Sequence, residues 1–94
     1  MNPAAEIKMP EISRFFGIVI AIYWMEHGTP HFHAKYGEHR ASFSIIDLAL
    51  LEGSLPSRVT ALVLEWAFLH RHELLEDWQR AMQKQPLKAI KPLD

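Results

Sequence analysis

The segment 31–46 constrains the fold most, because it predicts a β-hairpin with a defined register. Gly37-Glu38 places Gly at the first central position of a two-residue type II′ turn, which favours a left-handed backbone there. The cross-strand pairs that follow are Tyr36 with His39, Ala34 with Ala41 and Phe32 with Phe43, and on the opposite face His33 with Ser42 and His31 with Ser44. An aromatic pair belongs in a core, so the face that carries histidine and serine is predicted to be polar.

Two further apolar segments extend this hairpin into a sheet. Residues 15–24 are rich in β-branched and aromatic side chains on both faces, which predicts a central strand that is covered on both sides. Residues 48–51 predict a short additional strand. We therefore expect an antiparallel β-meander of three or four strands in the first half of the chain.

The second half of the chain is predicted to be helical. Ser54 or Leu55 is the expected N-terminal cap, with Pro56 in the first turn, where its missing N–H costs nothing. Apolar side chains then recur at helical spacing, at Val59, Leu62, Val63, Trp66, His70, Leu74, Trp78 and Met82. This stripe predicts one long, bent helix, or two consecutive helices with a break in 70–73, packed on one face of the sheet.

The helical part is expected to end at Gln85, because a residue that precedes proline is disfavoured in the α region. Residues 86–94 then predict an extended C-terminal arm that packs back on the domain. The fold class expected from the sequence is therefore α+β.

Length and composition predict one domain. The chain has 94 residues, of which 49% are hydrophobic, and we expect residues 9–94 to form a single domain and residues 1–8 an N-terminal extension. Translation from Met1 and from Met9 both fit the sequence. The chain contains no cysteine, which excludes disulfides and thiolate metal sites.

Charge and hydropathy narrow the cellular context and the partners. Ten Lys and Arg against eleven Asp and Glu give a net charge of −1, which does not favour a nucleic-acid partner. The longest apolar run, residues 15–24, is about half a membrane span, and the N-terminus lacks the apolar core of a signal peptide. We expect a cytoplasmic protein without a membrane segment.

Half of the six histidines lie within seven residues, at His27, His31 and His33. Side chains two apart on a strand share a face, and their Cα atoms are roughly 6.6 Å apart. Three imidazoles so placed are candidate ligands for a divalent transition metal such as zinc, with a position left for water. Glu26 is the nearby acid, as a ligand or as a partner of a ligand. The alternative is that the histidines form hydrogen bonds on a half-exposed sheet face.

Other side chains are candidates for the same surface. His70 lies on the apolar stripe of the helix, from which it could join His31 or His33 as a catalytic group, or be a core histidine bonded to a backbone carbonyl. A second set of side chains is predicted to contact an anion or a partner, and comprises Arg14, Lys35, Arg40, Ser42 and Ser44. Lys35 and Arg40 face each other in the predicted register, so their like charges must be solvated or neutralised by Glu26 or Glu38.

Three segments carry a resemblance to a known family. They are residues 9–18 (MPEISRFFGI), residues 30–37 (PHFHAKYG), and 64–67 (LEWA) with 69–71 (LHR). With these segments the chain resembles the small bacterial family catalogued as domain of unknown function 4160. The resemblance implies a gene arrangement of the toxin–antitoxin kind, in which a second small protein is the partner.

The apolar segment 15–24 also bears on partners. One helical layer does not cover both of its faces, so the C-terminal arm, the N-terminal extension, a second subunit in a homodimer or a cognate small protein is expected to pack there. Two function classes follow. The first is a binding or regulatory protein, one half of a toxin–antitoxin-like module; the alternative is a histidine-based or metal-dependent hydrolase, such as a ribonuclease-like toxin, that uses His27, His31 and His33. The sequence leaves open whether the chain is an enzyme.

Overall fold

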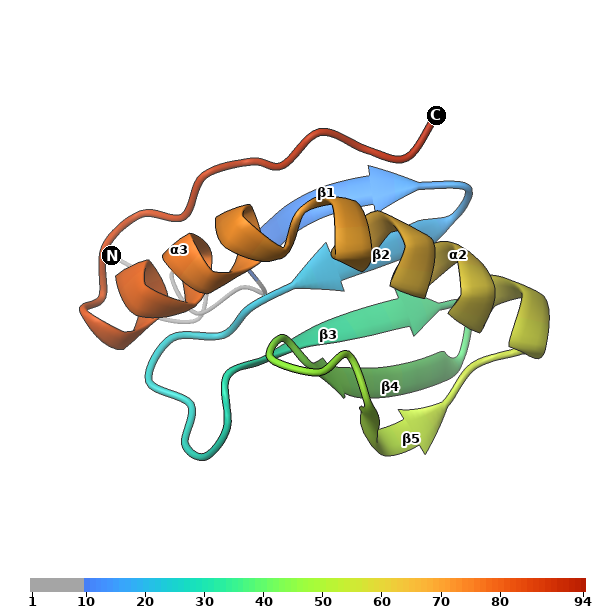
Figure 1. Ribbon diagram of the computed structural model, residues 1–94, viewed down its shortest axis with the longest axis horizontal. Coiled ribbons are helices and arrows are strands. Elements are labelled where there is room, and N and C mark those ends of the chain that lie inside the picture. The colour runs from blue at the N-terminus through green and yellow to red at the C-terminus, as the bar shows by residue number, and fades with distance from the viewer. Residues whose placement is uncertain (1–9) are drawn as a thin grey trace, which may run out of the picture.

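The computed structural model of the protein describes residues 10–94, so the predicted extension 1–8 and Met9 lie outside the described residues. Five strands are followed by two helices (Figure 1). Their bounds are β1 (Glu11–Phe15), β2 (Ile18–Ala21), β3 (His31–Tyr36), β4 (His39–Ser44), β5 (Leu50–Ser54), α2 (Ser57–Leu69) and α3 (Arg71–Met82).

The strands form one antiparallel sheet in the order β1-β2-β3-β4-β5, and both helices lie on the same face of it (Figure 1). The predicted α+β class, the meander and the one-sided helical layer are therefore confirmed. The sheet has five strands where three or four were predicted. In the part of the chain that the structure describes, neither helix has the length and apolar character needed to cross a membrane.

The additional strand results from a turn at residues 16–17, inside the segment that was predicted to be one strand. Phe16 and Gly17 both have positive φ, of 51° and 79°, as the two central residues of a type I′ turn require. The single strand predicted over 15–24 is therefore wrong: β1 and β2 are separate strands, paired with Phe15 opposite Ile18. A bulky residue is uncommon at positive φ, which explains why Phe16 does not signal a turn in the sequence.

The hairpin of β3 and β4 has the predicted register throughout. Phe32 pairs with Phe43, and His33 pairs with Ser42. Gly37 has φ of 59° and Glu38 does not have positive φ, in agreement with the predicted type II′ turn. Phe32 and Phe43 are fully buried and their rings stack with centroids 5.5 Å apart, so the aromatic face is the core face.

Strand β5 begins two residues later than predicted and forms an exposed edge of the sheet. Its pairing with β4 is interrupted by a bulge between Ser42 and Phe43. All five of its residues are exposed, including Leu50 and Leu51. The N-cap of α2 is Pro56. The predicted caps Ser54 and Leu55 are therefore both wrong, since Ser54 belongs to β5, and Pro56 precedes the first turn instead of lying in it.

The helical half consists of two helices rather than one long helix. His70 has a non-helical backbone (φ −122°, ψ 26°) and is both the C-cap of α2 and the N-cap of α3. The break therefore lies at the start of the segment 70–73 where the sequence analysis allowed it. Helix α3 ends at Met82, three residues before the predicted end at Gln85.

The core lies between the helices and one face of the sheet, with Trp66 of α2 at its centre. Its fully buried indole packs against Phe15 and Phe32, with ring centroids 5.4 and 6.1 Å away. The apolar stripe contributes as predicted, since Val59, Val63, Leu74 and Trp78 are buried as well. Among residues 10–94, no helix lies on the opposite face of the sheet, which is called the open face below.

Residues after α3 form the predicted extended arm, which lies along β1 (Figure 1). The Ile90 N–H donates to the carbonyl of Ile12 (2.8 Å), and the Trp66 indole Nε1 donates to the carbonyl of Lys91 (2.9 Å). Buried Asp77 accepts a hydrogen bond from the backbone N–H of Lys88 (2.8 Å), and burial raises the pKa of its carboxyl. The arm thus covers the β1 edge and leaves the β5 edge open.

Substitution of two glycines, Gly53 and Gly37, can show how closely β5 approaches β4. A Cβ on Gly53 (φ 75°) would lie 2.1 Å from the carbonyl oxygen of Arg40, whereas a Cβ on Gly37 (φ 59°) would meet no atom within 4 Å. Gly37→Ala is expected to cost about 1–2 kcal/mol of unfolding free energy, from left-handed strain alone. Gly53→Ala adds a backbone clash and should cost distinctly more, measured by urea denaturation of both variants. Equal losses would contradict the close approach.

Candidate functional site on the open face of the sheet

Alternation along β3 sorts its side chains between the two faces of the sheet. Phe32 and Ala34 are buried in the core, whereas His31, His33 and Lys35 lie on the open face and are half-buried. Antiparallel pairing continues the pattern into the neighbouring strands: Ala21 and Ser42 flank His33 on either side. The open face therefore presents two histidines at the start of β3.

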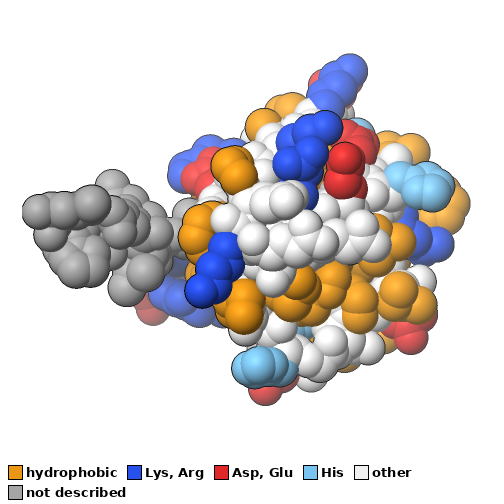
Figure 2. All heavy atoms as spheres, turned by 90° about the vertical axis from the view of Figure 1, so that its left-hand side faces the viewer, with side chains coloured by type: hydrophobic (Ala, Val, Ile, Leu, Met, Phe, Trp, Pro, Cys, Tyr) orange, Lys and Arg blue, Asp and Glu red, His pale blue; other side chains and the backbone are white. Residues whose placement is uncertain are grey.

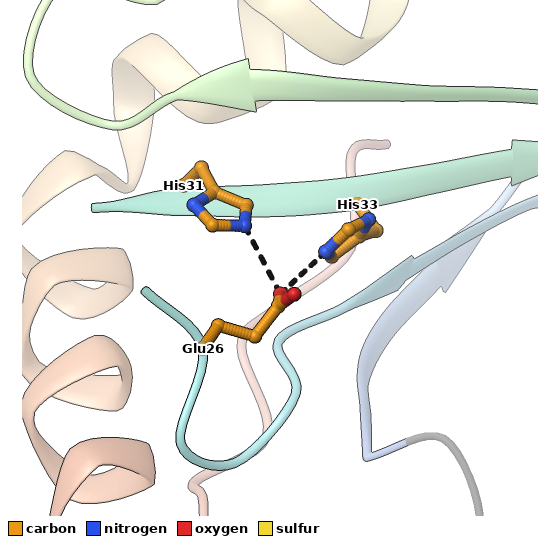
Figure 3. A group of neighbouring side chains, drawn as sticks. All are labelled: Glu26, His31 and His33. Carbon is orange, nitrogen blue, oxygen red and sulfur yellow. Dashed lines mark hydrogen bonds and ion pairs between the residues drawn. The ribbon is translucent and has the colours of Figure 1, made fainter. Parts of the chain in front are cut away.

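Glu26 reaches this pair from the β2–β3 loop, residues 22–30. The loop is held near the end of α3 by a hydrogen bond from Met25 N–H to the carbonyl of Ala81 (3.4 Å), and Met25 and Gly28 have positive φ. The Glu26 side chain points at both rings (Figure 3). Its Oε1 lies 2.6 Å from Nε2 of His33 and 3.0 Å from Nε2 of His31.

Each histidine ring is also fixed by a second contact. His31 donates from Nδ1 to the backbone carbonyl of Thr29 (2.8 Å), and its ring packs on that of Trp78 with centroids 5.0 Å apart. The His33 ring packs edge-on against Tyr23, with centroids 4.6 Å apart. The two imidazoles therefore have little freedom to turn away from Glu26.

The bond to Thr29 determines how His31 can be protonated. A carbonyl only accepts, so Nδ1 of His31 must carry a proton. Three states then satisfy Nε2: an imidazolium that donates to the Glu26 carboxylate, a neutral ring whose Nε2 lone pair faces the carboxylate across a cation, or a neutral ring that accepts from a protonated Glu26 carboxyl. The second state is the usual arrangement of a metal-binding histidine, whose other N–H is bonded to a carbonyl.

The three side chains fit a transition-metal site. One ligand atom from each of Glu26, His31 and His33 can be chosen so that all three lie within 4.8 Å of one another. Zn²⁺ lies about 2.0–2.2 Å from nitrogen and oxygen ligands, which puts ligand atoms on one ion roughly 3 Å apart. The Glu26–His31 separation of 3.0 Å already has this value, whereas the Glu26–His33 separation of 2.6 Å is shorter. Three protein ligands leave positions for water, and the side chains are 13–30% exposed, so the site is open to solvent.

The predicted site residues are only partly brought together. His27 is exposed and lies outside the group; with Thr29, His31, Ser42, Leu51 and Glu52 it lines a neighbouring hollow of the open face. His70 also lies apart, at the α2–α3 junction, where its Nδ1 is 2.5 Å from Oε1 of Glu73 and its ring packs on Trp66. Among the described residues, the group that could hold a metal ion is Glu26, His31 and His33.

The predicted anion or partner contacts divide into two groups. Arg14 is bonded to Glu11 through both carboxylate oxygens (2.9 and 2.8 Å), and the Oγ of Ser44 accepts from the backbone N–H groups of Ile46 and Asp47. By contrast, Lys35, Arg40 and Ser42 line hollows of the open face beside His33.

Two residues of this surface were not identified from the sequence. Tyr23 contacts His33, and its parity with Val19 and Ala21 was the signal that places it on the open face. Glu52 lines the hollows on the other side of Ser42. Its position depends on the bulge in the β4–β5 pairing, for which the sequence contains no distinct signal.

The fold and the site define a class: a small α+β protein whose one-sided helical layer leaves a His-His-Glu cluster on an open sheet face. A family model described as Domain of unknown function (DUF4160) matches residues 17–79, which cover β2 to most of α3 and all three cluster residues. The chain belongs to this family. No curated protein and no solved structure matches the chain.

The histidine cluster is tested by metal titration. Wild-type protein is expected to bind one equivalent of Zn²⁺ in isothermal titration calorimetry. Glu26→Gln, His31→Ala and His33→Ala remove a ligand each and should weaken binding by more than the roughly 10–100-fold that loss of an outer partner costs.

His27→Ala is the matched control, because His27 lies four residues from His31 but outside the group. It should bind Zn²⁺ as the wild type does. Loss of binding in His27→Ala together with retention in Glu26→Gln would contradict the ligand set, and thermal melts confirm that each variant is folded.

Proposed function

We propose that the protein is a small metal-dependent hydrolase whose active site is the open face of the sheet. The observation that carries this proposal is the convergence of His31, His33 and Glu26 on one point that is open to solvent. A divalent transition metal held by these residues would lower the pKa of a bound water to about 7 and so supply the nucleophile. In the hydrolysis, the water oxygen would bond to the carbon or phosphorus of an ester as the bond to the leaving oxygen breaks, and a water proton would pass to that oxygen.

Residues of the chain supply the remaining requirements. Thr29 and Trp78 hold His31 in place, so its Nε2 is presented without reorganisation. The hollows beside His33 offer a substrate a place next to the cluster, and in the described part of the chain no residue of α2 or α3 lines them. The toxin-like ribonuclease predicted as the alternative from the sequence is one member of this proposed class.

The hydrolase proposal is tested with two chromogenic esters, 4-nitrophenyl acetate and bis(4-nitrophenyl) phosphate. Zn²⁺- or Mn²⁺-loaded wild type should release nitrophenol from at least one of them. His33→Ala and Glu26→Gln should lose more than about 100-fold in rate, while His72→Ala, on an exposed helix position, should not. Metal binding without turnover of either ester would overturn the proposal.

A second candidate function is the one predicted first from the sequence: a cytoplasmic binding or regulatory protein, one half of a toxin–antitoxin-like module. The observation that favours it is the β5 edge of the sheet, where Leu50 and Leu51 are exposed. An edge strand has backbone N–H and C=O groups that can pair with a strand of another molecule. Hydrophobic side chains also form a band across the end of the molecule where α3 ends and the β2–β3 loop lies (Figure 2). A second copy and a cognate small protein are the two partners proposed.

Association through β5 is tested by light scattering at rising protein concentration, alone and with the product of the neighbouring gene. Leu51→Lys should abolish association, because it places a charge in the strand that pairs. Phe68→Lys is the matched control: Phe68 is also exposed but lies on α2. A wild type that stays monomeric at all concentrations and does not bind the neighbouring product would contradict this function.

A further inference from the structure

We propose that Lys35 and Arg40 bind the phosphate group of the substrate, which makes the open face a site for phosphate esters. This inference rests on the proposed hydrolase, since it assigns a substrate class to the same site. The observation behind it is that the two cations beside His33 have no carboxylate partner among the described residues. This observation does not depend on the metal ligands.

The two cations are held against each other by the sheet. Lys35 of β3 and Arg40 of β4 are direct cross-strand partners, flanking the Gly37-Glu38 turn. Like charges that face each other across an antiparallel pair are destabilising. An anion bound between Lys35 and Arg40 would remove this repulsion and so stabilise the protein.

The nearby carboxylates do not neutralise this pair. Glu26 is bonded to the two histidines, and Glu11 is bonded to Arg14, the third cation of the same row of the sheet. Among residues 10–94, no carboxylate oxygen lies within the 4.0 Å ion-pair distance of Lys35 or Arg40. Glu38 and Glu52, the other two acids of this region, thus leave both cations available.

The cations and the histidine cluster are linked by one residue, His33. Lys35, Arg40 and His33 line the same hollow, and Arg40 and His33 also line the adjoining one. Neither Glu26 nor His31 lines these two hollows, so His33 is the residue that the cluster and the cationic hollows share. A phosphate group held there, with Arg40 as a planar fork and Lys35 as a point charge, would lie beside the cluster that could hold the metal.

Val19 and Tyr23 also line the hollow that contains Lys35 and Arg40. Val19 is the cross-strand neighbour of Lys35, and Tyr23 packs edge-on against His33. A carboxylic ester carries no charge for Lys35 and Arg40 to bind. The pair therefore favours a phosphate ester over a carboxylic ester as substrate.

The experiment measures binding of two probes to metal-free protein, inorganic phosphate and phenyl phosphate, by NMR titration at low salt. Both should bind to the wild type, and Lys35→Gln and Arg40→Gln should each weaken binding at least about tenfold, with added salt doing the same. Arg58→Gln removes an exposed cation of α2 and should leave binding unchanged. Melting curves should show that phosphate raises the midpoint of the wild type and not that of Lys35→Gln.

The outcomes separate this inference from the hydrolase proposal. Loss of probe binding in Lys35→Gln and Arg40→Gln with intact Zn²⁺ binding supports the phosphate site. Equal probe binding in wild type and both variants overturns it, as does binding of inorganic phosphate alone without phenyl phosphate. If Zn²⁺-loaded protein hydrolyses only the carboxylic ester, the phosphate assignment fails while the metal-dependent hydrolase stands.

Discussion

Both the core and the candidate site depend on the alternation of side chains along β3. Phe32 belongs to the buried stack with Phe43, and the neighbouring positions necessarily project His31 and His33 to the other face. A slip of one residue in the pairing would exchange the two sets, placing imidazoles in the core and an aromatic ring in the site. Burial of Phe32 under Trp66 therefore holds the histidines in place from behind the sheet.

The same alternation explains which parts of the fold the sequence predicted. The β3–β4 hairpin was predicted residue by residue because turn chemistry at Gly37 and face polarity agree on one register. The first hairpin was missed because Phe16, a strand-forming side chain, occupies a left-handed turn position. The start of β5 was missed by two residues because residues 45–47 form a turn and Leu48, an apolar side chain, has positive φ (60°), so it cannot begin the strand. Helical spacing predicted the apolar stripe, but whether it breaks at His70 depends on packing.

Prediction of the site succeeded where it followed strand parity and failed where it depended on a loop. His31 and His33 share a face by parity alone, whereas the choice between His27 and Glu26 as the third group depends on the path of residues 22–30. That path is set by a contact with α3, far away in the sequence, and by the positive φ of Met25. The Lys35 and Arg40 pair was evident from the register, but its lack of a neutralising acid followed only once Glu26 was seen to bind the histidines.

The C-terminal arm has a consequence for the order in which the chain can reach its native state. The indole of Trp66, the carbonyl of Ile12 and the carboxyl of Asp77 all find their partners between Lys88 and Lys91. During synthesis, every strand and both helices leave the ribosome before those partners do. A nascent chain that ends before Lys88 therefore has an uncovered β1 edge and unsatisfied polar groups at Ile12, Trp66 and Asp77. Completion of the core is in this way tied to translation of the last segment of the domain.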